Sequence, residues 1–234
     1  MMNKWFLSLR WLWMLGVVVL IAACGNEEAQ RQAFIEFLQK SVIEKQGGFI
    51  TVLTQEQREH FGDYASHYDI IVDFNRSMGE VVKPLNGIAR EMTSTMKQNV
   101  DAEARKALMV KLNDQFQQIN KKLDEELSRA ETRLADLNQP DDLKAVYTQA
   151  FERTVRTPGR ISREMVSLTA EMVTKANEVF DFIANNPDKI EIKGGRMIAK
   201  DRAVLTKLNA FQADLLAIVQ KLQELKAQYD ALAG

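Results

Sequence analysis

The sequence predicts an all-α protein, an elongated bundle of long amphipathic helices with one small β-hairpin near residues 189–199. Two observations support this fold class. Apolar residues recur at three- and four-residue spacing along most of the chain after its first 26 residues, which is the period of a helix. Glycine and proline are also scarce, with 11 and 4 among 234 residues, so few positions interrupt a helix.

The first 23 residues follow a different pattern. Residues 1–10 carry Lys4 and Arg10 and no acidic side chain, and residues 11–23, WLWMLGVVVLIAA, carry no charge. A basic region, a short apolar region and small residues at its end predict an export signal over residues 1–23. The charge-free run is well short of the roughly 20 residues that a membrane-spanning helix needs.

Three helical segments are expected in the first half of the remaining chain. Apolar spacing predicts a helix over residues 27–46, which would end at the glycine pair that follows it. Thr54 and Gln57 fit a capping box at the start of the next helix. After an interruption at Gly62, a longer helix is expected to reach about residue 99, with a bend near Pro84.

The clearest helix is predicted over residues 101–138, where nine apolar residues form one stripe. They are Leu108, Leu112, Phe116, Ile119, Leu123, Leu127, Ala130, Leu134 and Leu137. The acidic pair Asp141 and Asp142 suits the first turn of another helix, because the helix dipole favours negative charge there. We expect that helix to break at Thr157-Pro158-Gly159 and a new one to run over about 160–185.

The last quarter of the chain predicts a hairpin and a long helix. Gly194-Gly195 stands between two alternating runs, which favours a two-residue turn, with Ile190, Ile192 and Met197 packed onto a helix. Residues 201–233 then show apolar steps of three and four, as in a coiled-coil seam. The candidate interaction seam is Leu208, Leu215, Ile218, Leu222 and Leu225. Helix 101–138 is its expected antiparallel partner, although the seam could instead pair with another chain.

The single cysteine of the chain lies where the apolar run ends. Ile21-Ala22-Ala23-Cys24 resembles the lipobox of bacterial lipoproteins. In that class, the cysteine thiol receives a diacylglycerol, the signal is cleaved before the cysteine, and the new amine is acylated. The resemblance implies a lipid anchor at Cys24, with S-diacylglycerol and N-palmitoyl groups. Since Gly25 follows where an aspartate often marks inner-membrane retention, it also implies the outer membrane, facing the periplasm.

These observations predict a simple domain organisation. Residues 1–23 form the signal peptide, and residues 24–234 form a single periplasmic helical domain whose first residues, 24–30, are a short tether. Lysine and arginine total 31 against 32 aspartates and glutamates, so charge gives no reason to expect a nucleic-acid partner.

No catalytic or metal-binding pattern emerges from the sequence. On one continuous helix, His60, Asp63 and His67 would share a face. However, the two histidines would stand about 10.5 Å apart along its axis, too far for one ion, and Gly62 falls between them. We interpret both histidines as surface residues. We expect no metal, no cofactor and no enzymatic activity, because no hydrolase, nucleotide-binding or zinc-protease motif occurs.

Three segments resemble a known family. They are AFIEFLQ at 33–39, LTQEQ at 53–57 with FG at 61–62, and DDLKAVYTQAF at 141–151. Together with the glycine-turn hairpin, they are similar to the YiaF-like lipoproteins of enterobacteria, which are grouped under a domain of unknown function. The resemblance covers essentially the whole chain. It implies a lipidated periplasmic helical domain and provides no catalytic residues.

The function expected from the sequence is that of an outer-membrane lipoprotein. It would act without catalysis, binding a protein partner of the envelope through its helical domain, and self-association is possible. One alternative is a carrier that holds an apolar ligand in a groove between helices, since methionine and phenylalanine side chains can line such a groove. A weaker alternative is an envelope hydrolase whose site assembles from distant residues.

Overall fold

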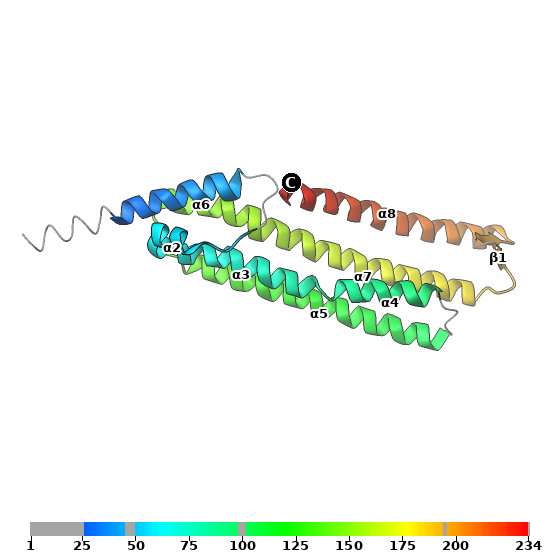
Figure 1. Ribbon diagram of the computed structural model, residues 1–234. Helices are drawn as coiled ribbons and strands as arrows, with labels where there is room; N and C mark the ends of the chain where they lie inside the picture. The colour runs from blue at the N-terminus through cyan, green and yellow to red at the C-terminus, as the bar shows by residue number, and fades with distance from the viewer. Residues whose placement is uncertain (1–25, 45–49, 98–101, 194–195, 234) are drawn as a thin grey trace, which may run out of the picture.

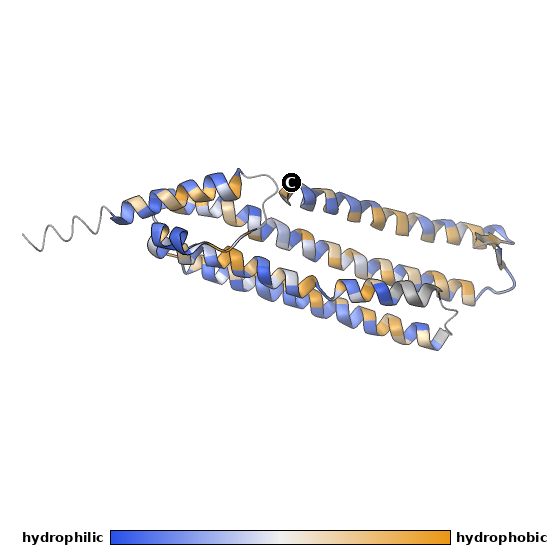
Figure 2. Ribbon diagram, viewed as in Figure 1, coloured by the Kyte–Doolittle hydropathy of each residue, from blue (hydrophilic) through white to orange (hydrophobic). Residues whose placement is uncertain are grey.

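The computed structural model describes residues 26–44, 50–97, 102–193 and 196–233. Long helices lie side by side in an elongated bundle, and one two-stranded antiparallel sheet sits at the end far from residue 26 (Figure 1). Apolar and polar residues alternate around the long helices (Figure 2). The all-α prediction is therefore confirmed. None of the helices in the described ranges is long and apolar enough to cross a bilayer.

The described part of the chain opens with a helix over residues 26–37, which continues as the π-helical segment η1 (Leu38–Ile43). Helix α2 (Gln55–Phe61) starts at the predicted capping box. The Thr54 hydroxyl accepts a bond from the Gln57 N–H, and the Gln57 side chain accepts one from the Thr54 N–H. Gly62 ends this helix at a φ of 55°, a conformation that glycine adopts without strain. The glycine pair predicted to end the first helix lies outside the described residues.

A short 3₁₀ segment, η2 (Gly62–Tyr64), leads into α3 (Ala65–Val82), and α4 (Leu85–Lys97) follows. A turn at Lys83 and Pro84 separates these two helices, where a bend within one helix was predicted, because proline has no N–H to extend the preceding helix. Helix α5 (Ala102–Ala135) confirms the clearest predicted helix. Six residues of its stripe are buried, namely Leu108, Leu112, Phe116, Ile119, Leu123 and Ala130, and Leu127, Leu134 and Leu137 pack against the same core.

The break predicted at Thr157-Pro158-Gly159 is wrong. Helix α6 (Asp141–Phe151) passes through the π-helical segment η3 (Glu152–Arg156) directly into α7 (Thr157–Ala184). The result is one central helix of roughly 65 Å at 1.5 Å per residue. The start of α6 at the acidic pair is confirmed.

Contacts with α3 explain how the central helix continues through Pro158. In a regular α-helix, residue 158 would donate to the carbonyl of Thr154, but proline has no N–H. The side-chain amide of Asn75 on α3 donates to that carbonyl instead, at 3.1 Å. Gly159 admits α3 at the same level, since a Cβ there would lie 3.2 Å from the Cζ atom of Phe74.

Strands β1 (Ile190–Lys193) and β2 (Arg196–Ala199) form the predicted hairpin. Ile190 pairs with Ala199 and Lys193 with Arg196, while the two glycines between the strands lie outside the described residues. Ile190 is buried, as expected, but Met197 is 49% exposed, so the prediction that it packs onto a helix is wrong. The register explains this result, because Ile190 lies at the base of the hairpin and Met197 lies closer to its tip.

Helix α8 (Arg202–Ala233) packs along α7, not along α5 as predicted. The short hairpin that joins α7 to α8 makes them antiparallel neighbours, and α7 separates α8 from α5 (Figure 1). Buried side chains of Ile161, Leu168, Ile218 and Leu225 form a small core between α7 and α8. Lys221 on α8 pairs with Glu164 on α7 at 3.0 Å.

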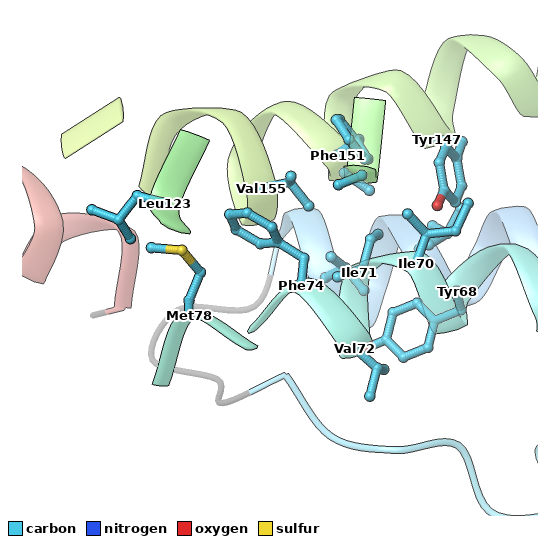
Figure 3. Close-up of a cluster of buried hydrophobic side chains, with 14 of the residues drawn as sticks. Tyr68, Ile70, Ile71, Val72, Phe74, Met78, Leu123, Tyr147, Phe151 and Val155 are labelled. Atoms are coloured by element: carbon cyan, nitrogen blue, oxygen red, sulfur yellow. The ribbon is translucent and has the colours of Figure 1, made fainter. Parts of the chain in front are cut away.

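The main core lies where α3, α5, η3 and the first helix meet. Figure 3 shows Phe74 of α3 close to Val155 of η3, with Met78 and Leu123 beyond them. Two ion pairs border this core. Arg133 on α5 bonds Asp73 at 2.9 Å, and Arg156 bonds both carboxylate oxygens of Glu131 at 2.6 and 2.8 Å. The core ties the first helix, which follows Cys24 in sequence, to the central helix.

Candidate functional site: the anchor-proximal aromatic cluster and the last helix

The predicted lipobox, Ile21 to Cys24, lies outside the described residues. The helix that follows starts at residue 26, so residues 26–30, predicted as part of a tether, are already helical. The Tyr64 hydroxyl donates to the Glu27 carboxylate at 3.2 Å, and the Arg31 guanidinium pairs with Asp142 on α6 at 3.3 Å. These contacts fix the start of the helix against the bundle, only two residues after Cys24.

A cluster of aromatic side chains lies under this first helix. We call it the aromatic cluster, and its members are Phe34, Phe37, Phe61, Tyr64, His67, Tyr68, Tyr147 and Phe151. Phe34 is fully buried at its centre, with its ring centroid 5.5 Å from that of Phe61 and 6.3 Å from that of Tyr64. Aromatic rings at these separations attract one another beyond the effect of burial alone. The cluster therefore holds the first helix firmly.

His67 is part of this cluster, so the interpretation of both histidines as surface residues is wrong for His67. It lies half-buried, and its Nδ1 atom is 3.0 Å from the side-chain nitrogen of Gln139. Burial lowers the pKa of His67, and the negative charge of Asp63 opposes that shift. The imidazole therefore favours its neutral form, in which Nδ1 accepts a bond from Gln139.

Two tyrosines complete the polar contacts of the cluster. The Tyr147 hydroxyl donates to the backbone carbonyl of His67 at 2.6 Å and points toward α3 (Figure 3). Burial raises the pKa of Tyr147 and raises the pKa of Tyr68 to about 12, so both phenols stay protonated. The Tyr147 hydroxyl therefore acts as a structural donor.

The structure does not bring the considered metal ligands together as a site. His60 and Asp63 are exposed on the surface, whereas His67 faces the aromatic rings. Within the ranges that the structure describes, no group of three or more His, Cys, Asp or Glu side chains could hold a metal ion.

The predicted interaction seam is placed against α7 of the same chain. Ile218 and Leu225 are buried there, and Leu208, Leu215 and Leu222 are half-buried. Sequence reasoning missed another face of α8, where Leu205, Leu216 and Val219 are exposed at 49, 55 and 37%. They are 11 and 3 residues apart, which puts them on one face of a helix, and that spacing was the available signal.

Two surface grooves run along α5. One has a volume of about 580 Å³ between α3 and α5, and charged side chains of Arg76, Glu80, Lys122, Glu125 and Glu126 are among its lining residues. The other, of about 760 Å³, is lined by α5 residues that include Asn120, Lys121 and Asp124. Sites for apolar ligands are lined mainly by hydrophobic and aromatic side chains, which is not the lining found here.

Comparison with known proteins places the chain in a family. A family model described as "Protein of unknown function (DUF3053)" matches residues 12–232. The chain is 25% identical to the uncharacterized protein YiaF of Escherichia coli strain K12 over 189 residues, which cover 80% of this chain and 78% of that protein. The same figures hold for YiaF of Shigella flexneri. No solved structure matches. With nearly its whole length matched, the chain belongs to the DUF3053 family of proteins of unknown function.

Proposed function

We propose that this protein is a lipoprotein of the bacterial outer membrane, anchored through Cys24 and facing the periplasm, where it acts as a non-enzymatic interaction module. The observation that supports this most is the seam at Ile21-Ala22-Ala23-Cys24, which follows a basic and then an apolar segment. The family match, residues 12–232, includes this seam.

The geometry after Cys24 supports the same proposal. An extended chain spans at most about 3.6 Å per residue, and the first helix begins at residue 26. An acylated Cys24 would therefore hold residue 26, where the described helix starts, within about 7 Å of the anchored cysteine. The hairpin β1–β2 lies at the other end of the bundle (Figure 1), which would project it away from the membrane.

A lipid anchor at Cys24 would hold the protein firmly. One acyl chain binds a bilayer only marginally, and stable anchoring needs a second signal. A cysteine that carries a diacylglycerol and an amide-linked acyl group supplies three chains. The bundle would then present its long polar faces to other envelope proteins.

The site geometry gives little support to catalysis at His67. Its ring contacts Phe34, Tyr64 and Tyr147, and its Nδ1 atom is engaged by the Gln139 amide. A hydrolase would need a nucleophile within hydrogen-bond reach of its base. We therefore retain the interaction module as the proposed function.

Metabolic labelling with radioactive palmitate, followed by membrane fractionation, tests the proposal. The native chain should take up label and appear in the outer membrane, whereas Cys24→Ser should take up none. Gly25→Asp is a matched variant, which should keep the label but move the protein to the inner membrane. Absence of label on the native chain would refute the anchor, and an unchanged location of Gly25→Asp would refute the sorting part of the proposal.

A further inference from the structure

Helix α8 carries a second seam, free of charge, on an exposed side next to the half-buried Leu208, Leu215 and Leu222. We call it the outer seam, and it consists of Leu205, Asn209, Gln212, Leu216, Val219 and Gln223. These residues step by four and three alternately, which is the spacing of a coiled-coil interface. All six are exposed, and three of them are among the most exposed large hydrophobic residues of the described chain.

The outer seam carries no charge over roughly 27 Å of helix. The charged residues of this stretch lie on the flank that borders α7, where Asp214 pairs with Lys175 at 3.8 Å and Lys221 pairs with Glu164 at 3.0 Å. The next positions at this spacing after Gln223 are the charged residues Lys226 and Asp230, so the uncharged seam ends there. These two side chains form an ion pair at 2.5 Å. The other exposed residues of this stretch outside the charged flank are uncharged as well, namely Thr206, Ala210, Ala213, Ala217 and Gln220. Depletion of charge is typical of the core of an interface.

We propose that the outer seam binds the outer seam of a second copy of this chain, as a parallel two-stranded coiled coil. In a parallel pair, each seam residue faces its own counterpart, so any charge in the seam would face a like charge. The absence of charge between Leu205 and Gln223 meets this requirement. Leu216 and Val219 would form the apolar centre of the interface.

The amide side chains fit the same partner. An amide has both a donor and an acceptor, so Asn209, Gln212 and Gln223 can each bond their own counterpart in the second copy. A buried asparagine in such a seam also fixes register and oligomeric state. A membrane surface is a poorer occupant, because three of the six seam residues are amides and helices that lie on membranes carry lysine and arginine on their polar face.

The parallel orientation rests on the proposed lipid anchor. Two copies anchored to one membrane have their first helices at the same level, so their α8 helices run in the same direction. Pairing along α8 then needs no tilt of either bundle. In each copy, the inner face of α8 stays on α7, and the two bundles meet only through their outer seams.

Site-specific photo-crosslinking in intact cells tests this inference. Cells would make two copies of the full chain with different tags, and the photoreactive residue would replace Leu216 or, as a control, Ala210 on another exposed side of α8. We expect a product of twice the chain mass that contains both tags from position 216 and none from position 210. A product with a different protein or with lipid at 216, no product, or equal product from 210 would overturn the proposal.

A charged substitution tests the same contact independently. Val219→Asp in both copies places two like charges in register, so the yield from position 216 should fall at least tenfold. Ala210→Asp is the matched control and should leave the yield unchanged. Since Val219 is partly exposed, the bundle should stay folded, which thermal unfolding verifies. An unchanged yield with Val219→Asp would contradict the seam as the interface.

Orientation and anchoring are separated by two further measurements. With the photoreactive residue at position 205, a parallel pair joins the start of one α8 to the start of the other, whereas a join to residues 223–230 would overturn the parallel arrangement. Palmitate labelling of the same cells reports the anchor by itself. A crosslinked pair without label would reject the lipid anchor alone, and label without the pair would reject the interface alone.

Discussion

The side-chain amide of Asn75 donates a hydrogen bond of 3.1 Å to the carbonyl oxygen of Thr154, four residues before Pro158 in the central helix. The same amide also donates to the carbonyl of Ile71 at 2.9 Å. One side chain of α3 thus bonds its own helix and the π-helical segment η3 of the central helix. This bond satisfies a carbonyl that would otherwise lack its α-helical donor, because Pro158 has no N–H.

The contact predicts that Asn75→Leu destabilises the protein by about 1–3 kcal/mol, because a largely buried carbonyl loses its donor. Urea unfolding followed by circular dichroism measures the effect. In a Pro158→Ala background, residue 158 regains its N–H, so the cost of Asn75→Leu should be smaller. Equal costs in the two backgrounds would show that the asparagine does not compensate for the proline.

The close approach of α3 to α7 predicts opposite effects for two glycine substitutions. Gly159→Val should destabilise by about 2–3 kcal/mol, because its side chain would press on Phe74 and Leu127 in a packed interior. Gly79→Ala is the control, since a Cβ there meets nothing within 4 Å, and it should stabilise α3 by about 0.5–1 kcal/mol. Thermal unfolding distinguishes them, and a neutral Gly159→Val would contradict the packing described.

Much of the fold could be predicted from periodicity alone. The stripe from Leu108 to Leu137 and the capping box at Thr54 depend on residues close in sequence, and both are found in the structure. The continuity of the central helix could not be predicted, because it depends on Asn75, which lies 79 residues before Thr154. The partner of α8 was likewise undetermined, since α5 and α7 both offer an apolar stripe.

The candidate site was only partly visible in the sequence. The seam at Cys24 is a local pattern and needs no tertiary information. The environment of His67 is not local, because its contacts come from Phe34, Gln139 and Tyr147 in three separate segments. The outer seam of α8 was overlooked in the sequence because the candidate interaction seam on the same helix is more consistently apolar.

The aromatic cluster predicts that the first helix depends on Phe34. Phe34→Ala should cost about 3–5 kcal/mol, because a fully buried ring is removed. Hydrogen exchange should show that protection is lost over residues 26–43 before it is lost in α5 and α7. Val52→Ala, at a position that is 56% exposed, should change neither measurement. Uniform loss of protection would contradict a local role of the cluster.

His67 predicts a pH dependence of stability. Burial lowers its pKa below the ordinary value of 6.5, so the unfolded chain binds the proton more readily than the folded chain. The contribution of this group to the free energy of unfolding is therefore complete above about pH 6.5 and declines as the pH falls below that value. His67→Gln should flatten the profile between pH 7.5 and 5 in urea titrations. Parallel profiles for both proteins would rule out this origin.

The most direct test of the central claim is the mass of the N-terminal peptide from protein extracted from bacterial membranes. The proposed function predicts that this peptide begins at Cys24 and carries the added mass of a diacylglycerol and an amide-linked acyl chain. A peptide that begins at Met1, or one that begins at Cys24 with a free thiol and a free amine, would contradict it.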